Sequence, residues 1–286
     1  MASVALVVHN DRSSAANLAR ETARWLIEGG HAVRLLRPDA EVVGRNDLAV
    51  DPDELTNGCD VAVSLGGDGT MLRTVDLVAA HDIPVVGVNL GQLGYLTEVD
   101  PARLRDALTQ FFAGDYQIEE RMLLSVRVDA PSGGVDVTEA VALNEAVIEK
   151  TESGHTVRLD VTINDHFFTP YATDGVIVAT PTGSTAYAFS ARGPIVAPTH
   201  RALLLTPVSP HMLFDRTLVL EPTTELRITV AGHRPAALSV DGRMLGQLRR
   251  GDGIVATAAP HAARLVIFAP RDFHQILKSK FGLSDR

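Results

Sequence analysis

The sequence contains few residues of several types, and each scarcity excludes a kind of structure or of binding site. Among 286 residues there is one cysteine, Cys59, so no disulfide can form within the chain. Because Cys59 precedes an apolar strand-like run, we expect a buried, inert thiol. No run of about 18 apolar residues occurs, so no transmembrane helix is expected. The N-terminal apolar run is typical of a first strand rather than a signal peptide. We therefore expect a cytoplasmic protein with no membrane partner.

Positive charge is also scarce. The net charge is −9, and the only lysines are Lys150, Lys278 and Lys280. A general nucleic-acid binder would show a basic field, so nucleic acid is not an expected partner. A nucleotide remains allowed, because a local pocket can be positive on an acidic protein. Any bound phosphate must then be neutralised by arginine, by backbone dipoles or by a metal carried with the substrate.

Familiar ligand motifs are missing as well. No Gly-Lys pair occurs, which excludes a P-loop, and no G-x-G-x-x-G follows a strand and opens a helix. The histidines are scattered, without an H-x-x-x-H or C-x-x-C pair, so a zinc site held by the protein is not expected.

The patterns that are present predict two domains, which the chain length also favours. Up to about residue 117, apolar strand-like runs alternate with helical patterns, which indicates a parallel sheet covered by helices. Beyond that point period-2 runs and turn signals dominate, until a helical pattern over 272–281. We predict an α/β fold. A Rossmann-like α/β domain with a parallel sheet spans 1–117, a β-rich domain spans 118–265, and a helical segment at 266–286 could return to the first domain.

The stretch "VSLGGDGT" at 63–70 combines a phosphate-type glycine turn with an acid, Asp68. A strand-to-helix turn presents free N–H groups and the positive end of the helix dipole, and glycines let a ligand approach the backbone. A carboxylate there would repel phosphate, but it could orient a hydroxyl and take its proton. This pattern favours phosphoryl transfer to a hydroxyl. The alternative is a tight βα turn that binds nothing.

A second cluster, at 171–195, is a strand that opens into a turn rich in small and hydroxyl residues. Thr182, Ser184 and Thr185 offer hydroxyls, Ala186 leaves room for a flat ring, and Tyr187 can stack or donate a hydrogen bond. These features suit a nucleoside better than a lipid. The alternative is a helix capped by serine and threonine.

The glycine turn "GGDGT" resembles the signature shared by NAD kinases, diacylglycerol-type lipid kinases and 6-phosphofructokinases. The stretch at 171–195 resembles that of bacterial NAD kinases in particular. So do the stretches at 87–100, 143–150 and 204–213, in the same order. The resemblance covers roughly residues 60 to 281.

This resemblance implies a transferase that moves a phosphoryl group to the 2′-hydroxyl of the adenosine ribose of NAD and so makes NADP. The donor would be ATP, or polyphosphate, and a divalent metal, Mg²⁺, would arrive with ATP. The β-rich domain would then bind NAD. A homodimer or homotetramer is implied, because the family builds its pocket across subunits. The sequence does not decide between the two donors, nor whether NADH is accepted.

The same resemblance assigns roles. Asp68 would be the general base, Gly67 and Gly69 would let the ligand approach, and Arg73 would reach phosphate unless it is a solvated helix residue. Asn144 and Glu145 interrupt an apolar strand, and a buried amide and carboxyl need partners such as adenine and ribose. The remaining nucleotide-contacting positions are Tyr95, His155, Asp174, Thr182, Thr185, Ala186, Tyr187, Ser190, Ser209, His211 and Arg243.

Several of these have plainer readings. Tyr95 could be a packing aromatic, Asp174 a turn former and His211 a surface residue. In three places the chain departs from the family pattern. Arg192 stands where glycine is usual, and could brace a phosphate or point outward. Ala172 stands where a basic residue is frequent, and His155 where arginine is frequent.

Two other classes of function stay open at this point. The chain could be a kinase of the same superfamily acting on a lipid or a sugar phosphate. It could also be a protein that senses NAD(P) without catalysis.

Overall fold

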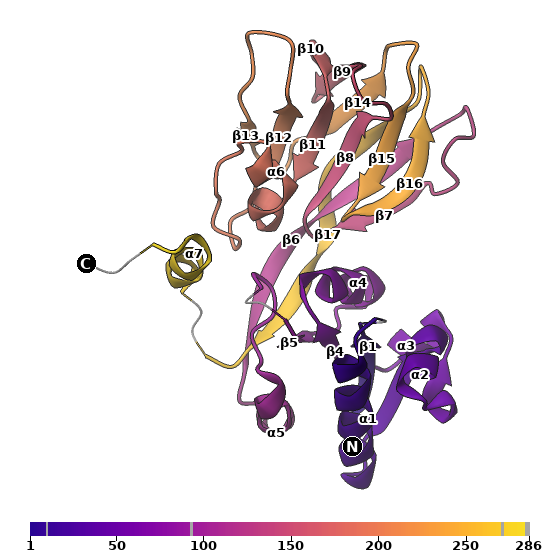
Figure 1. Ribbon diagram of the computed structural model, residues 1–286, viewed down its shortest axis with the longest axis vertical. Helices are drawn as coiled ribbons and strands as arrows, with labels where there is room; N and C mark the ends of the chain where they lie inside the picture. The colour runs from indigo at the N-terminus through magenta and orange to yellow at the C-terminus, as the bar shows by residue number, and fades with distance from the viewer. Residues whose placement is uncertain (10, 92–93, 270–271, 284–286) are drawn as a thin grey trace. The chain divides into compact units, whose positions relative to one another are not determined.

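The computed structural model describes residues 1–9, 11–91, 94–269 and 272–283. The chain divides into two compact units (Figure 1). The first comprises Met1–Glu120 and Ala263–Arg286, and the second comprises Arg121–Ala262. Strands β6 (Gln117–Asp129) and β17 (Gly253–Ile267) contribute residues to both units. The units change after residues 120 and 262, whereas the boundaries predicted from the sequence lie after residues 117 and 265.

The first unit alternates strands and helices, as predicted from the apolar runs. Its elements are β1 (Ser3–Val8), α1 (Ser13–Glu28), β2 (Ala32–Leu36), α2 (Arg37–Val43), β3 (Ala49–Val50), α3 (Pro52–Thr56), β4 (Val61–Gly66), α4 (Asp68–Val78), β5 (Val85–Asn89), α5 (Leu104–Ala113) and α7 (Phe273–Phe281). The strand order is β5-β4-β1-β2-β3, and every neighbouring pair is parallel. The predicted α/β fold class is thereby confirmed for this part of the chain.

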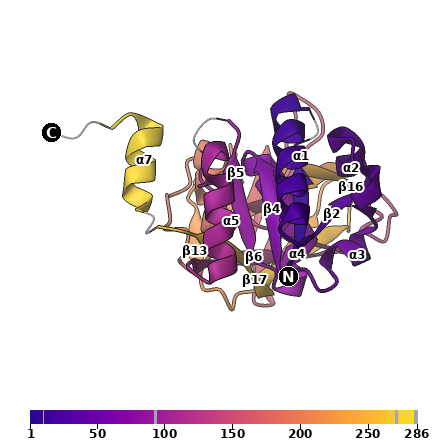
Figure 2. The same ribbon diagram turned by 90° about the horizontal axis from the view of Figure 1, so that it is seen from below.

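The core of this unit comes from amphipathic helices laid on apolar strands. Ala19 and Leu26 of α1 and Leu108 of α5 are buried in one cluster with alternate residues of β1, such as Val4 and Leu6. Alternation follows from the period of two in a strand, which sends neighbouring side chains to opposite faces. Figure 2 shows α1 and α5 lying over the strands of this sheet.

The strand order has a consequence for function. From β1 the chain runs outward through β2 and β3, then returns to β4 on the other side of β1 and continues to β5. The order in which the chain adds strands thus changes side between β1 and β4, although the two strands are parallel. In open parallel sheets, ligands bind outside the carboxyl ends of the strands at such a reversal. The glycine turn at 66–70 follows the carboxyl end of β4, at that position.

The second unit is β-rich, as predicted. Besides its parts of β6 and β17, its elements are β7 (Glu139–Ala142), β8 (Glu145–Lys150), β9 (Val157–Ile163), β10 (His166–Thr173), β11 (Gly175–Ala179), α6 (Tyr187–Ser190), β12 (Leu203–Val208), β13 (Leu218–Leu220), β14 (Leu226–Val230), β15 (Ala236–Val240) and β16 (Arg243–Leu248). One antiparallel sheet has the order β13-β12-β11-β8-β15-β16, and in the other β10, β9, β14 and β17 are successive neighbours.

Both sheets of the second unit share one core. Ala146 and Ile148 of β8 and Val176 of β11 pack in the same buried cluster as Leu159 of β9 and Ile228 of β14. The cluster therefore takes alternate residues from each sheet, which is the packing of a β-sandwich.

None of the helices in the described part of the chain is long and apolar enough to cross a membrane.

Candidate active site

Asp68 sits at the point where β4 turns into α4, with its carboxylate held in place by the backbone. The carboxylate oxygens accept hydrogen bonds from the N–H groups of Tyr95, at 3.0 Å, and Leu96, at 3.1 Å. The side chain is half-buried. An ionised carboxylate has about four acceptor positions, so these two bonds fix the group and leave acceptor capacity for a ligand. Asp68 is therefore a positioned acid rather than a freely moving one.

Gly94 makes this arrangement possible, and the sequence reasoning missed it. A Cβ at Gly94 would lie 2.2 Å from the Asp68 Oδ1 atom, so only glycine lets the carboxylate come this close. The signal was present in the predicted stretch at 87–100, where the chain reads Gly94-Tyr95-Leu96. The two residues before it, Gln92 and Leu93, lie outside the described residues.

The other glycines of the turn divide into two kinds. A Cβ at Gly66 would lie 2.1 Å from the Thr70 hydroxyl oxygen, so the fold itself requires glycine there. At Gly67 and Gly69 a Cβ would meet no described atom within 4 Å, and neither residue has a positive φ. Packing and backbone conformation within the described chain thus give no reason for glycine at 67 and 69. A ligand that approaches the backbone would give one.

Arg73 has a protein partner one helical turn further on. Its guanidinium lies 2.7 Å from the carboxylate of Asp39 and donates to the Val8 carbonyl at 3.2 Å. Asp39 is 0% exposed and accepts the N–H of Val8. Burial raises the pKa of the Asp39 carboxyl, and the Arg73 guanidinium opposes that shift. Arg73 therefore ties α4 to the carboxyl end of β1, and contact with phosphate remains a prediction.

Two charged side chains, those of Lys280 and Asp68, lie near Tyr95. The Lys280 ammonium of α7 lies 4.7 Å from the ring centroid, a cation–π distance. Burial and the nearby Asp68 carboxylate both raise the pKa of the Tyr95 hydroxyl. The C-terminal helix thus contacts the loop that holds Asp68. Its contact residue is one of only three lysines in the sequence.

In the second unit, an aspartate that sequence reasoning did not single out shapes the turn at Asn144-Glu145. The Asp241 carboxylate accepts three backbone N–H groups, those of Leu143 at 2.7 Å, Asn144 at 2.8 Å and Glu145 at 3.0 Å. Asp241 has φ 46°, a left-handed conformation that aspartate tolerates. In the sequence, Asp241-Gly242 is a turn dipeptide with no sign of this role.

Glu145 has a buried carboxyl group, and one of its oxygens lacks a hydrogen-bond partner within the described chain. It is 7% exposed, and its Oε2 atom has no hydrogen-bond partner among the described residues. Burial, and then the Asp241 carboxylate, raise the Glu145 pKa to about 8, while the N–H of Tyr187 opposes them. At neutral pH Glu145 is therefore largely protonated, and it can donate as well as accept a hydrogen bond.

The two nucleotide clusters predicted in this unit lie directly against each other. The Asn144 carbonyl accepts the N–H of Thr180 at 2.9 Å. A Cβ on Gly183 would come 2.1 Å from the same oxygen, so only glycine permits this packing. A further missed residue, Arg121, is buried and donates to the Thr182 hydroxyl at 3.3 Å. The structure therefore brings the Asn-Glu pair and the threonine-rich turn together.

The rest of the threonine-rich run is held by its own backbone. Thr182–Thr185 form a 3-10 turn, the N–H of Ala186 donates to the Gly183 carbonyl, and α6 follows from Tyr187. The Thr185 hydroxyl donates to the Thr182 carbonyl at 3.3 Å.

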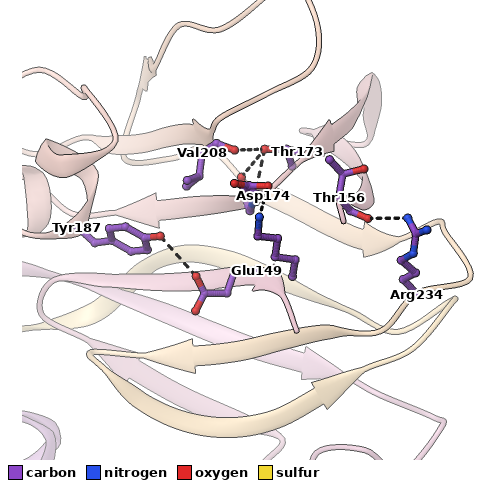
Figure 3. A network of polar contacts seen from close by, with 9 residues as sticks. Glu149, Thr156, Thr173, Asp174, Tyr187, Val208 and Arg234 are labelled. Carbon is purple, nitrogen blue, oxygen red and sulfur yellow. Dashed lines mark hydrogen bonds and ion pairs between the residues drawn. The ribbon is translucent and has the colours of Figure 1, made fainter. Parts of the chain in front are cut away.

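Asp174 and Tyr187 are engaged with residues of β8 (Figure 3). Asp174 lies 2.7 Å from the Lys150 ammonium, and the Tyr187 hydroxyl points to Glu149, at 3.4 Å. Half-exposed Asp174 therefore already has a cationic partner within the chain.

Five more of the predicted residues are spread over the surface and the cavities of the second unit. Ser190 and Ser209 are exposed and line a cavity of about 670 Å³ together with Tyr187. His155 lines a much smaller cavity, of about 40 Å³. His211 and Arg243 are exposed and belong to neither lining.

Comparison with known proteins gives the family. The model for the ATP-NAD kinase N-terminal domain matches residues 4–116, and the model for the ATP-NAD kinase C-terminal domain matches residues 143–268. The chain belongs to the NAD kinase family. It is 41% identical to an NAD kinase of Heliobacterium modesticaldum over 98% of each chain. The resemblance seen in the sequence is thereby confirmed.

Two solved structures resemble this chain in fold. The crystal structure of a yeast NADH kinase complexed with NADH matches all of this chain and 89% of its own, with a TM-score of 0.90 and 26% identity. An NAD kinase from Archaeoglobus fulgidus in complex with ATP matches 98% of this chain and 97% of its own, with a TM-score of 0.69. At 23% identity, the second likeness supports the fold alone.

Proposed function

We propose that this chain is an NAD kinase that transfers the γ-phosphoryl group of ATP to the 2′-hydroxyl of the adenosine ribose of NAD. The family assignment supports the reaction class. The observation that carries the chemistry is Asp68, held by two backbone N–H groups at the carboxyl end of β4. Both matching family models describe ATP-NAD kinase domains, which disfavours a kinase that acts on a lipid or a sugar phosphate.

Asp68 would act as the general base. The ribose hydroxyl would hydrogen-bond to a carboxylate oxygen and give up its proton as its oxygen bonds to the γ-phosphorus. The bond from that phosphorus to the bridging β–γ oxygen breaks, and ADP leaves. Because Asp68 is already held by Tyr95 and Leu96, little orientation has to be gained in the transition state, which favours the reaction.

The second unit would hold the dinucleotide. Glu145 can donate from its protonated carboxyl to a ribose oxygen, and the Asn144 amide can pair with the adenine edge. Tyr187 offers a ring for stacking. The other residues that we assign to NAD on the family resemblance are Tyr95 in the first unit and His155, Asp174, Thr182, Thr185, Ala186, Ser190, Ser209, His211 and Arg243 in the second.

The donor phosphates would be held without a metal site built from the protein alone. The described residues contain no group of three or more His, Cys, Asp or Glu that could hold a metal ion. Mg²⁺ is bound in many kinases through substrate phosphates and keeps several waters. On the family resemblance we assign Mg²⁺ to the ATP phosphates, where it would neutralise developing charge. Gly67, Gly69 and the N-terminus of α4 would approach the phosphates, with polyphosphate as a second donor to be tested.

We further propose a cytoplasmic homodimer or homotetramer, as the family resemblance implies. Size-exclusion chromatography with light scattering would measure the assembly. A monomer at all accessible concentrations would contradict this proposal.

The experiment for the catalytic role is Asp68→Asn. Formation of NADP from NAD and ATP would be followed at 340 nm through an NADP-dependent dehydrogenase, and NAD binding by calorimetry. Loss of a general base costs about 10²–10⁴-fold in rate, so we expect kcat to fall by that range. Because each oxygen of Asp68 accepts one N–H, asparagine can satisfy only one of the two. Thermal unfolding must therefore be measured alongside.

Asp76→Asn is the matched control, since Asp76 is an exposed carboxylate on the same helix, α4. An Asp68→Asn enzyme with the parental kcat would remove Asp68 from the base role. A parent that binds NADP tightly without turnover would support a sensing protein instead. A substrate panel containing NADH, a diacylglycerol and fructose 6-phosphate, each with ATP, tests the acceptor.

A further inference from the structure

The cavity of about 670 Å³ in the second unit has a charge that the proposed roles do not explain. Its walls come from the end of α6, the end of β12 and residues 215–217. Its volume lies in the range of about 300–1,000 Å³ that is usual for small-molecule sites. Tyr187, Ser190 and Ser209 bring hydroxyl groups to the lining, and Arg192 and Arg216 bring guanidinium groups.

Two backbone conformations at this cavity are unusual for their residue types. In the described chain, the non-glycine residues with positive φ are Asp82, Asn164, Asp165, Asp241, Arg192 and Ser209. Four of these are Asn or Asp, which adopt the left-handed region readily. Arg192, at φ 66°, and Ser209, at φ 47°, do not belong to that group, and both line the cavity. Strained residues that gather at one cavity are an indication of function.

The local fold explains why glycine would be easier at 192. Residue 192 follows the end of α6, and its N–H donates to the Phe189 carbonyl at 2.9 Å. This is the left-handed position that commonly ends a helix and that glycine occupies without strain. An arginine there keeps the strained conformation and adds a long cationic side chain at the cavity.

The charge of Arg192 is available to a ligand. Arg192 is exposed, and its guanidinium has no partner among the described residues. Arg216, by contrast, lies 3.4 Å from the Asp215 carboxylate, so that pair is close to neutral. The cavity thus presents one uncompensated positive charge beside hydroxyl donors, which suits an anion with phosphate-like oxygens.

We propose that Arg192 binds the diphosphate of the dinucleotide in this cavity and so raises the affinity of the chain for NAD. This inference rests on the proposed function. In NAD the adenine and the two riboses are neutral and the oxidised nicotinamide ring is cationic, so a guanidinium would repel the nicotinamide ring. The diphosphate carries two negative charges and accepts hydrogen bonds from both guanidinium and hydroxyl groups.

The experiment uses the full chain and three variants at position 192. Arg192→Gln removes the charge and keeps a side chain in the strained conformation. Arg192→Lys keeps the charge without the planar fork, and Arg192→Gly removes both charge and strain. Arg250→Gln is the matched control, because Arg250 is exposed and lies outside the cavity lining. Calorimetry measures the binding of NAD, of inorganic pyrophosphate and of adenosine.

We expect Arg192→Gln and Arg192→Gly to bind NAD about tenfold more weakly than the parent, which is the typical effect of one charge-assisted hydrogen bond. Arg192→Lys should lie between, adenosine affinity should not change, and the parent should lose NAD affinity with added KCl more steeply than Arg192→Gln. Arg192→Gly should unfold at a higher temperature than the parent, because the strain is gone.

The outcomes separate this inference from the proposed function. If the parent makes NADP but Arg192→Gln binds NAD as Arg250→Gln does, the role of Arg192 is wrong and the kinase proposal stands. If the parent binds pyrophosphate through Arg192 but makes no NADP, the anion site stands and the kinase proposal falls. An equal loss of adenosine and NAD affinity in Arg192→Gln would show a disturbed cavity and overturn the charge argument.

Discussion

Gly94→Ala perturbs the proposed base without changing it. An alanine Cβ at position 94 would lie 2.2 Å from Asp68 Oδ1, 3.0 Å from Asp68 Cγ and 2.8 Å from the Thr97 hydroxyl oxygen. Ordinary van der Waals contact begins near 3.4 Å. The carboxylate, or the loop beneath it, must therefore move by about 1 Å, and Thr97, which is buried, restricts the movement of the loop.

Such a displacement acts directly on the geometry of proton transfer. If the carboxylate moves, it loses its hydrogen bonds to the Tyr95 and Leu96 N–H groups, and if the loop moves, those donors move with it. A misplacement of about 1 Å can cost on the order of 100-fold in rate. We expect kcat in the dehydrogenase-coupled assay to fall by about 100-fold, with the NAD dissociation constant changed by less than about threefold, because the residues assigned to NAD other than Asp68 and Tyr95 belong to the second unit.

A second Gly→Ala change controls for general effects of the substitution. Gly29 ends α1 at φ −78°, a conformation that alanine adopts without strain, and the nearest atom to its Cβ would be Cδ2 of His31, at 3.3 Å. Gly29→Ala should therefore keep parental kcat. A Gly94→Ala enzyme that also keeps parental kcat would refute the claim that the position of Asp68 matters. So would a loss of activity no larger than the loss of folded protein.

Three further predictions follow from the carboxylates of the structure. Asp241→Asn keeps a residue that tolerates the left-handed backbone but has one acceptor oxygen for three N–H groups, so calorimetry should show NAD affinity about tenfold weaker; unchanged affinity would contradict this. Since the Glu145 pKa is raised from 4.5 to about 8, the folded state holds that proton more tightly than the unfolded chain, and stability present below pH 4.5 is lost as pH rises to 8. Thermal unfolding of Glu145→Gln should therefore lack part of the parent's decline between pH 5 and 8, and identical pH profiles would refute the shift. Arg73→Ala removes the guanidinium beside the buried Asp39 carboxylate and should lower the free energy of unfolding by about 2 kcal/mol, a value reduced because Arg73 is partly exposed. Arg73→Ala/Asp39→Asn should recover part of it in denaturant titrations, whereas unchanged stability with a raised KM for ATP would assign Arg73 to phosphate.

The main features of the fold could be predicted because they depend on local patterns. Strand-like runs that alternate with helical patterns predict a parallel sheet, and period-2 runs beyond residue 117 predict the β-rich unit. The place of Asp68 followed as well, since a glycine turn after a buried strand lies at the carboxyl end of that strand. The strand order could not be predicted from the sequence. Only the structure shows that the carboxyl end of β4 lies where the order of strands changes side.

The partners of the site residues were not predictable, because they come from distant parts of the chain. Asp241 holds the turn at Asn144 from 97 residues away, and Arg73 pairs with Asp39 from 34 residues away. Neither pairing leaves a local pattern. Arg73 illustrates the consequence. Its position one turn into α4 suggested phosphate, whereas its nearest anion in the structure is a buried aspartate.

The two acidic turns of the chain solve the same physical problem in different ways. At Asp68 and at Asp241, backbone N–H groups hold a carboxylate, which fixes its position. Asp68 keeps acceptor capacity and is only half-buried, so a ligand hydroxyl can reach it. Asp241 uses its oxygens on three N–H groups, and its charge helps to keep the neighbouring Glu145 protonated. Half-buried Asp241 thus shapes the Asn144-Glu145 turn and, together with the burial of Glu145, keeps the hydrogen-bond donor of that turn protonated, which is why the pair cannot be understood from its own side chains.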